Sequence, residues 1–424
     1  MRSPLRKLLG NEFVRNVLTL LTGNTISQAI GLLSIPILTR LYSPEEFGAV
    51  ALFISILSVC TVASTARYDS AIVIPRRNGH AFHLMAGSIM LVTAFSLVIL
   101  IVIAAFHGQI APLFGHTSFR GIIWLLPLLV FLMGSHKSIQ LWFNRNRYFK
   151  SIAINSVAQT SSQTALRLCR PLYTNGYWGL IVGLLVGEVI AWGLYVRKLL
   201  QTDYWRAKHL SLATTFRVFR EYSNFPAYLL PMGIINTFST NILVFSLSAI
   251  ASSATVGLYE RAWRVITLPL TLISSSFASV FYERMTRTQN PKRLFLASYF
   301  INLGLATALL FPVFIWGEAI FGFVLGPDWE VAGRMARVIL PLTLFNYATA
   351  CISNVFSVYS KNQVLLVWQI IYLILVVTWI FMARNLDIFT IIQIYAFIGA
   401  TLYAILAIIG FYIVCSFTRS QPKN

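Results

Sequence analysis

The chain is poor in charge, and above all in acidic charge. Only 11% of its 424 residues are Asp, Glu, Lys or Arg, against roughly 25% in an average soluble domain. No stretch between its apolar runs is long enough to fold as a separate domain, so a soluble catalytic module is excluded. The sequence also lacks a glycine-rich phosphate-binding loop, which excludes ATP hydrolysis within this chain.

Cysteine is scarce as well. The four cysteines lie inside apolar runs at Cys60, Cys169, Cys351 and Cys415. Their spacing fits neither a zinc site nor a disulfide framework, so we expect no metal and no cofactor. The longest expected outer loop, near residues 107–119, is short and has no catalytic constellation, which predicts that the chain is not an enzyme.

What the sequence does contain is apolar residues, which make up 57% of it. They recur in runs of about 20 residues, the length that crosses the hydrocarbon core of a bilayer. We therefore predict an all-α integral membrane protein of about 12 transmembrane helices. The expected spans are 12–39, 45–69, 81–106, 120–143, 149–173, 177–197, 223–250, 255–282, 294–320, 331–358, 363–383 and 389–416. They form an N-terminal bundle (1–200), a basic cytoplasmic linker (201–222) and a C-terminal bundle (223–424).

Basic residues fix the expected orientation. Lys and Arg number 33, and 22 of these fall at alternate ends of the spans, whereas only Arg40, Arg120 and Arg384 fall at the opposite ends. Positive charge is retained in the cytoplasm, so we expect a bacterial inner-membrane protein with both termini cytoplasmic. This bias accounts for most of the net charge of +20. Nucleic-acid binding is not expected, because it needs basic residues clustered on a folded face.

The second half of the chain echoes the first. The segment Ser43–Gly48 resembles Ser252–Gly257 at an offset of 209, and Leu125–Leu128 resembles Ile339–Leu342 at an offset of 214. Parallel repeats of this kind build transporters from two bundles around a central cavity. We therefore predict two bundles of six spans, with chance similarity between apolar helices as the alternative.

Eight basic residues fall within the expected spans, with three acids. The bases are Arg67, Lys137, Arg167, Arg170, Arg261, Arg264, Arg334 and Arg337, and the acids are Asp69, Glu188 and Glu260. A cation facing lipid costs about 2.5–3.5 kcal/mol on the insertion scale, so these side chains are expected to face protein, water or head groups. The surplus of about five positive charges predicts an anionic substrate.

Ion pairing is the alternative role for these residues. Glu188 is a candidate partner of Arg167 or Arg170, and Glu260 of Arg264 four residues on. Arg167 and Arg170 share one face of a span rich in Asn, Gln, Ser and Thr, which predicts that this span lines an aqueous cavity.

Polar residues of the first span have two interpretations. Asn24 is a candidate contact for sugar hydroxyls, and hydrogen bonding between neighbouring helices is the other role for such residues.

One region resembles a known family. Gly23-Asn24, the stretch Ile35–Gly48 and the stretch Arg67–Pro75 resemble the opening of polysaccharide-biosynthesis transporters. These are the O-antigen (Wzx-type) flippases of the multidrug/oligosaccharidyl-lipid/polysaccharide (MOP) exporter superfamily, and the match is most specific over residues 22–80. The resemblance implies two helical bundles around a V-shaped cavity and translocation of undecaprenyl-pyrophosphate-linked repeat units to the periplasmic leaflet. It also makes Arg40, Arg67 and Asp69 the motif positions that carry over.

Together these observations predict a flippase for an anionic lipid-linked oligosaccharide, with membrane lipids, a polysaccharide polymerase and glycosyltransferases as further partners. The expected contacts to the cargo are Arg167, Arg170, Arg261, Arg264, Lys137, Arg40, Arg67 and Asn24. Glu188, Asp69 and Glu260 are expected to be counter-ions or coupling residues. A cation-coupled multidrug antiporter and a polytopic O-antigen polymerase or ligase are the alternatives. The sequence does not reveal the sugar, the energy source or the oligomeric state.

Overall fold

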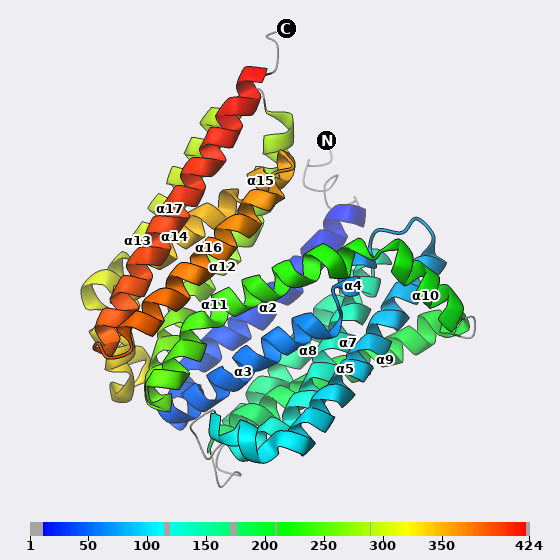
Figure 1. Ribbon diagram of the computed structural model, residues 1–424, viewed down its shortest axis with the longest axis horizontal. Coiled ribbons are helices and arrows are strands. Elements are labelled where there is room, and N and C mark those ends of the chain that lie inside the picture. The colour runs from blue at the N-terminus through cyan, green and yellow to red at the C-terminus, as the bar shows by residue number, and fades with distance from the viewer. Residues whose placement is uncertain (1–11, 114–118, 170–175, 208–209, 289, 421–424) are drawn as a thin grey trace, which may run out of the picture. The chain divides into compact units, whose positions relative to one another are not determined.

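The fold consists almost wholly of long helices. A computed structural model describes residues 12–113, 119–169, 176–207, 210–288 and 290–420, and no strand occurs in these ranges (Figure 1). Twelve helices in them have 20 or more residues: α2 (Glu12–Leu41), α3 (Pro44–Ser64), α5 (Asn78–Leu113), α7 (Leu126–Arg145), α8 (Phe149–Leu168), α9 (Gly176–Ala207), α11 (Leu230–Ile250), α12 (Ser253–Arg287), α13 (Pro291–Leu325), α14 (Glu330–Ile352), α16 (Asn362–Ala383) and α17 (Ile388–Ser420). Each overlaps one predicted span in chain order, which confirms the predicted fold class.

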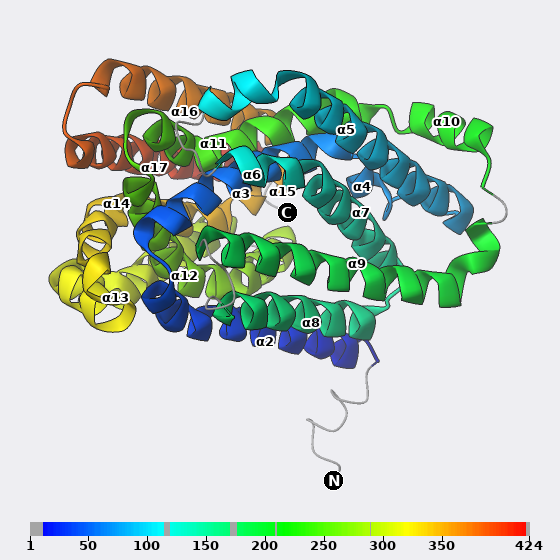
Figure 2. The same cartoon turned by 90° about the horizontal axis from the view of Figure 1, so that it is seen from below.

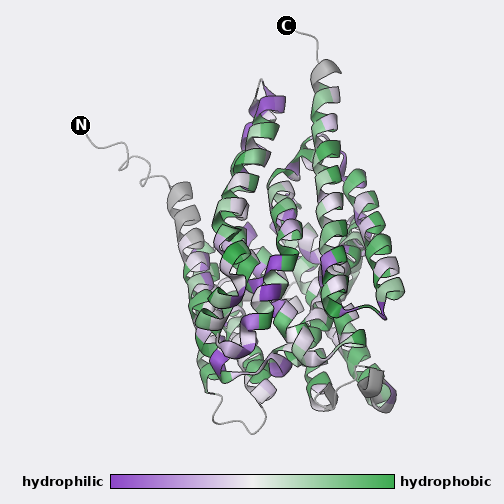
Figure 3. Ribbon diagram, turned by 90° about the vertical axis from the view of Figure 1, so that its left-hand side faces the viewer, coloured by the Kyte–Doolittle hydropathy of each residue, from purple (hydrophilic) through white to green (hydrophobic). Residues whose placement is uncertain are grey.

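These helices differ in whether they are apolar enough to cross a membrane. Within the described ranges, nine helical segments are long and apolar enough to cross a membrane. Figure 3 shows hydrophobic positions along most of the helices, with hydrophilic positions interrupting them. The three long helices outside that set of nine are α2, α8 and α12. These same helices contain the polar or basic stretches that the sequence assigned to a cavity.

Short helical elements lie between the long helices or beside their ends. They are α4 (Tyr68–Ala71), α6 (Phe119–Ile122), η1 (Ile123–Leu125), α10 (Leu212–Glu221), η3 (Phe225–Leu229), η4 (Pro327–Trp329) and α15 (Asn354–Val358). The predicted span 45–69 ends early, at Ser64, because Ala66 and Arg67 adopt left-handed backbone angles with φ of 45° and 62°. The span predicted from residue 223 begins instead with a π-helical turn next to Pro226.

The chain forms two compact units. Unit 1 comprises residues 1–42 and 49–238, and unit 2 comprises residues 43–48 and 239–424. In unit 1, α8 packs side by side with both α2 and α9, and α7 packs against α5 and α9 (Figure 2). In unit 2, α14 is central, because it packs against α12, α13 and α17.

Hydrogen bonds from Trp142 and Arg145 of α7 hold neighbouring segments together at one end of unit 1. Trp142 is fully buried and donates its indole N–H to Asp203 Oδ2 at 3.1 Å. Arg145, one turn further along α7, donates to the backbone carbonyls of Val73 (3.1 Å) and Pro75 and to the side chain of Asn78 (3.1 Å). These bonds hold the connection between α4 and α5 against the end of α7.

Close approach of backbones shapes unit 2. A Cβ atom on Gly333 of α14 would lie only 2.3 Å from the carbonyl oxygen of Gly317 in α13. Small residues of this kind let two membrane helices approach closely and gain van der Waals contact. The contact fixes α13 and α14 as a tight antiparallel hairpin around Gly326, whose φ is 115°.

The two segments of the first predicted repeat have the same local structure. Ser43 Oγ accepts a hydrogen bond from the backbone N–H of Glu46, and Ser252 Oγ accepts one from that of Thr255, each at 3.3 Å. Both serines therefore cap the helix that follows. The second match differs in structure, because Pro127 lies in the first turn of α7 whereas Pro341 lies inside α14.

Candidate functional site

The first candidate residues of unit 1 are held in an ion pair. The short helix α4 follows the left-handed turn at Arg67 and brings Asp69 into the bundle, where it is fully buried. Lys137 Nζ of α7 lies 3.1 Å from Asp69 Oδ2, and Thr65 donates to Asp69 Oδ1 at 3.0 Å. Asp69 is therefore the counter-ion of Lys137, and this pair carries no net charge.

The described partners of Glu188 are a histidine and a glutamine. His136 Nδ1 lies 3.1 Å from Glu188 Oε2, and Gln159 Nε2 donates to Glu188 Oε1 at 2.6 Å. Among the described residues Glu188 pairs with His136 rather than with Arg167. The alternative partner, Arg170, lies outside the described residues, so a pair with it stays a prediction.

Helix register explains this difference. Gly187, next to Glu188, faces Gln163 of α8, since a Cβ there would lie 3.0 Å from Gln163 Cβ. Arg167 lies one turn further along α8 and faces Gly183, whose Cβ would lie 2.7 Å from Arg167 Cγ. Position along the helix therefore separates Arg167 from Glu188, and its Nε donates to the carbonyl of Leu180 at 3.4 Å.

Arg67 has a buried hydrogen-bond donor without a partner among the described residues. Its side chain is half-buried, and its Nε has no hydrogen-bond partner among the described residues. It lies beside Gly233 of α11, where an added Cβ would be 3.4 Å from Arg67 Nε. A buried donor of this kind is costly unless a ligand or water accepts its hydrogen bond.

Residues of α2 divide between the two expected roles. Asn24 and Arg40 are exposed in the structure. Ser27 is buried and bonds to Ser156 of α8 at 2.9 Å, so for this serine the helix-to-helix role is correct. Asn24 and Arg40 stay candidates for cargo contact.

In unit 2 one carboxylate serves two arginines of α12. Glu260 lies 3.2 Å from Arg264 Nη1, which confirms the predicted pair four residues apart. It also lies 3.2 Å from Arg261 Nη2, a pairing that the sequence did not suggest. Arg261 is buried, with its guanidinium carbon 3.9 Å from the ring centroid of Phe47, whereas the Arg264 side chain is half exposed. One positive charge remains after Glu260 is counted.

A second shared carboxylate was missed by the sequence analysis. Glu318 of α13 lies 3.3 Å from both Arg334 Nε and Arg337 Nη1 of α14. A signal was present, because Glu318 and Arg334 are each eight residues from Gly326 at the hairpin turn. Residues equidistant from the turn of an antiparallel helical hairpin lie side by side.

The missed acid changes the charge count. Seven of the eight bases are described, and four carboxylates accompany them when Glu318 is included: Asp69, Glu188, Glu260 and Glu318. Counting Glu318 lowers the surplus of the eight bases from the expected five to four, and three of these positive charges belong to described residues. Ion pairing therefore absorbs more of the basic residues than predicted, but it does not absorb all of them.

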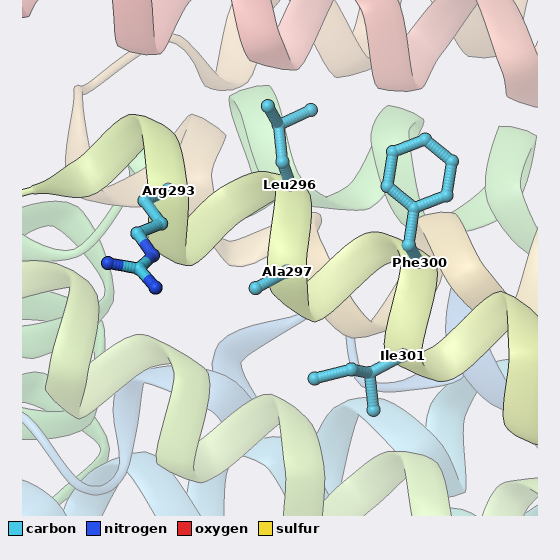
Figure 4. Close-up of a pocket in the computed structure, with 5 residues that line it drawn as sticks. All are labelled: Arg293, Leu296, Ala297, Phe300 and Ile301. Carbon is cyan, nitrogen blue, oxygen red and sulfur yellow. The ribbon is translucent and has the colours of Figure 1, made fainter.

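Unit 2 also has a recess with a basic residue at one end. The recess runs along α13 with a volume of about 760 Å³. Figure 4 shows Leu296 and Phe300 projecting from one side of this helix, with Ala297, Ile301 and Arg293 also labelled around it. No group of three or more metal-ligating side chains occurs among the described residues.

Comparison with known proteins shows the family to which the sequence is similar. The family model described as "Polysaccharide biosynthesis protein" matches residues 37–334. The succinoglycan biosynthesis transport protein ExoT of Rhizobium meliloti (strain 1021) is 23% identical over 352 residues, which are 78% of this chain and 67% of that protein.

Solved structures agree on the fold. An inward-facing multidrug resistance MATE family transporter of the MOP superfamily superposes with a TM-score of 0.69 at 16% identity, covering 95% of this chain and 96% of that one. A MOP superfamily transporter from Pyrococcus furiosus gives a TM-score of 0.66 at 13% identity, with all of both chains covered. The chain belongs to the polysaccharide biosynthesis protein family, and its fold is that of the MOP superfamily transporters with which it superposes.

Proposed function

We propose that the protein is a flippase that moves an anionic lipid-linked oligosaccharide from the cytoplasmic to the periplasmic leaflet of a bacterial inner membrane. Family membership supports a transporter of polysaccharide biosynthesis. The bias of Lys and Arg toward alternate span ends supports a topology with both termini cytoplasmic. A polymerase and glycosyltransferases that act on the same repeat unit are the expected partners.

The observation that carries the anionic cargo is the surplus of cations within the helices. Arg261 is buried and shares one carboxylate with Arg264, and the Nε of Arg67 has no described hydrogen-bond partner. Each arginine presents a planar set of donors that matches the oxygens of a phosphate group. An undecaprenyl pyrophosphate carrier supplies such a group, and its tail stays in the bilayer while the head group crosses.

The repeated architecture supports alternating access. Parallel repeats build transporters in which two bundles change their mutual arrangement and expose one site to each side in turn. The polar helices α2 and α8 of unit 1 and α12 of unit 2 provide the hydroxyls, amides and guanidiniums that a sugar pyrophosphate requires. In this mechanism Arg167, Arg170, Arg261 and Arg264 bind the head group, and Lys137 acts mainly through its pair with Asp69.

The two alternatives fit these residues less well. A site for cationic drugs favours an excess of carboxylates, whereas the seven described bases of the expected spans are accompanied by only the four carboxylates Asp69, Glu188, Glu260 and Glu318. A polymerase or ligase needs a catalytic group, and the relatives found are transporters.

The test is a flipping assay with fluorescent undecaprenyl-pyrophosphate oligosaccharide in proteoliposomes, comparing Arg264→Ala with Arg287→Ala. Both arginines lie on α12 and pair with a glutamate four residues earlier, at 3.2 Å and 3.3 Å. A hydrogen bond to a charged group contributes about 1.5–3 kcal/mol, so Arg264→Ala should weaken cargo binding about 10- to 100-fold. Arg287→Ala, at the exposed end of the helix, should flip like the unmodified protein.

Full activity of Arg264→Ala, Arg167→Ala and Arg170→Ala, all at normal expression, would contradict the basic cargo site. Efflux of cationic dyes without any flipping would favour the antiporter instead. Disruption of the gene in a polysaccharide-producing cell should also leave repeat units on the cytoplasmic leaflet.

A further inference from the structure

A second feature of unit 2 lies outside the residues assigned to the cargo. Helices α13 and α14 enclose a groove of about 320 Å³, within the roughly 300–1,000 Å³ range of ligand sites. Its walls include Leu310, Phe311 and Phe314 of α13 and Leu340 and Pro341 of α14. We call this feature the α13–α14 groove.

The surroundings of the groove indicate that hydrocarbon fills it. The α13 segment has the apolar character of a membrane span, and only 22% of its most apolar window is buried inside the protein. Phe311 and Phe314 at the groove are more than half exposed, at 54% and 59%. In a bilayer such surface faces lipid, and an apolar groove does not hold water.

One end of the groove is charged. The stem of Arg337 lines it, and the guanidinium of Arg337 lies 3.3 Å from Glu318, which also pairs with Arg334 at 3.3 Å. Two guanidiniums thus share one carboxylate, which leaves a net charge of plus one. The side chains of Arg334 and Arg337 are 57% and 42% exposed, so their remaining N–H donors are accessible to a ligand.

The order of charged and apolar residues along α14 resembles that of a lipid molecule, with a charged head followed by an apolar tail. Arg337 lies seven residues after the start of α14 at Glu330, which is about 10 Å along the helix axis. Leu340 and Leu344 line the groove one and two turns deeper. Charge therefore occurs near the start of α14, and the apolar walls of the groove continue along the helix away from that end.

We propose that the α13–α14 groove binds an anionic phospholipid, with one acyl chain in the groove and the phosphate at Arg334 and Arg337. A phosphate diester carries a single negative charge, which equals the surplus left by the two arginines and Glu318. A pyrophosphate-linked carrier brings more negative charge than this site offsets, so the bilayer lipid fits better than the cargo. This site is independent of the proposed flippase function.

Charge substitutions test the phosphate contact in both directions. Arg334→Gln leaves Glu318 paired with Arg337 and removes the surplus charge, so retention of phosphatidylglycerol by the delipidated protein should fall about tenfold. Glu318→Gln doubles the surplus, and phosphatidylglycerol should bind several-fold more tightly. Arg384→Gln is the control, because Arg384 is exposed and lies 5.5 Å from the ring of Phe381, outside the groove.

A groove-filling variant tests the acyl-chain site separately. Thr307 is exposed and lines the groove, so Thr307→Trp should block it without disturbing the ion pairs. Native mass spectrometry with added phosphatidylglycerol, phosphatidylcholine or undecaprenyl phosphate gives the occupancy for each variant.

The expected result is preference for phosphatidylglycerol over phosphatidylcholine, lost in Arg334→Gln and Thr307→Trp and kept in Arg384→Gln. Equal binding of the two phospholipids, or unchanged binding in Thr307→Trp, would overturn the proposal. Stronger binding of undecaprenyl phosphate that Thr307→Trp abolishes would also overturn it and assign the groove to the carrier.

Discussion

Gly48 and Gly257 make the same contact with each other's helix. A Cβ on Gly48 would lie 1.8 Å from the carbonyl oxygen of Ser253, and a Cβ on Gly257 would lie 1.9 Å from that of Pro44. Ser253 and Pro44 occupy the same position of the repeat, four residues before each glycine. Reciprocal contacts of this kind are what a two-fold relation between two copies of one element produces. The contact lies within unit 2 and supports an internal repeat over chance similarity.

The glycine contact predicts a large effect for a single methyl group. Gly48→Ala or Gly257→Ala would place Cβ against backbone that has no side chain to move, and overpacking of this kind costs about 1–3 kcal/mol. We expect a lower unfolding temperature for each variant in detergent. Gly304→Ala is the control, because nothing lies within 4 Å of the position of its Cβ, and alanine in a helix should stabilise it by about 0.5–1 kcal/mol. Equal stability of all three variants would contradict the close contact.

The buried pair of Asp69 and Lys137 predicts an asymmetric response to mutation. Lys137→Met leaves a fully buried carboxylate without its cation, which costs about 3–5 kcal/mol. Asp69→Asn leaves a lysine whose side chain is 37% exposed rather than fully buried, so its loss of stability should be smaller. The double variant should recover part of the stability lost in Lys137→Met. A double-mutant cycle by thermal unfolding measures the coupling, and strict additivity of the two changes would argue against the pair.

The order and approximate bounds of the helices were predicted from the sequence more successfully than the side-chain contacts between helices. The length of the apolar runs predicted the order and approximate bounds of the long helices, because a run of about 20 residues matches the hydrocarbon thickness. The early end of α3 was not predictable, since left-handed backbone at Ala66 and Arg67 has no glycine to signal it. Pairing of Glu188 with His136 depends on the rotation of α7, α8 and α9 about their axes, which composition does not determine.

Part of the candidate site was accessible to sequence reasoning. Glu260 and Arg264 were predicted correctly, because a separation of four residues on one helix places them together. Glu318 was missed although its symmetry with Arg334 about Gly326 was visible in the sequence. The stacking of Arg261 on Phe47 was not visible, because it joins residues more than two hundred positions apart. Arg170 lies outside the described residues, so its role stays a prediction.

Removal of the acid between the two α12 arginines distinguishes the proposed cargo from a cationic drug. Glu260→Gln leaves Arg261 and Arg264 without their carboxylate, so an anionic head group should bind more tightly and the unliganded protein should be less stable. Binding of a fluorescent pyrophosphate lipid and thermal unfolding with and without that lipid measure both effects. Glu283→Gln, which removes an exposed pair with Arg287 on the same helix, is the matched control. Weaker binding of the anionic lipid in Glu260→Gln would contradict a basic cargo site.

The last prediction concerns the connection between α4 and α5, which one side chain holds. Arg145 donates to the carbonyls of Val73 and Pro75 and to Asn78, and each such bond from a charged donor is worth about 1.5–3 kcal/mol. Arg145→Gln should free this connection, so amide hydrogen exchange over residues 73–78 should accelerate at least about tenfold. Lys150→Gln, an exposed charge at the start of the next helix, should leave that exchange unchanged. The fully buried Trp142 one turn earlier should keep its fluorescence spectrum in Arg145→Gln, since the change is local. Unchanged exchange with an altered tryptophan spectrum would mean that Arg145 stabilises the bundle rather than the connection.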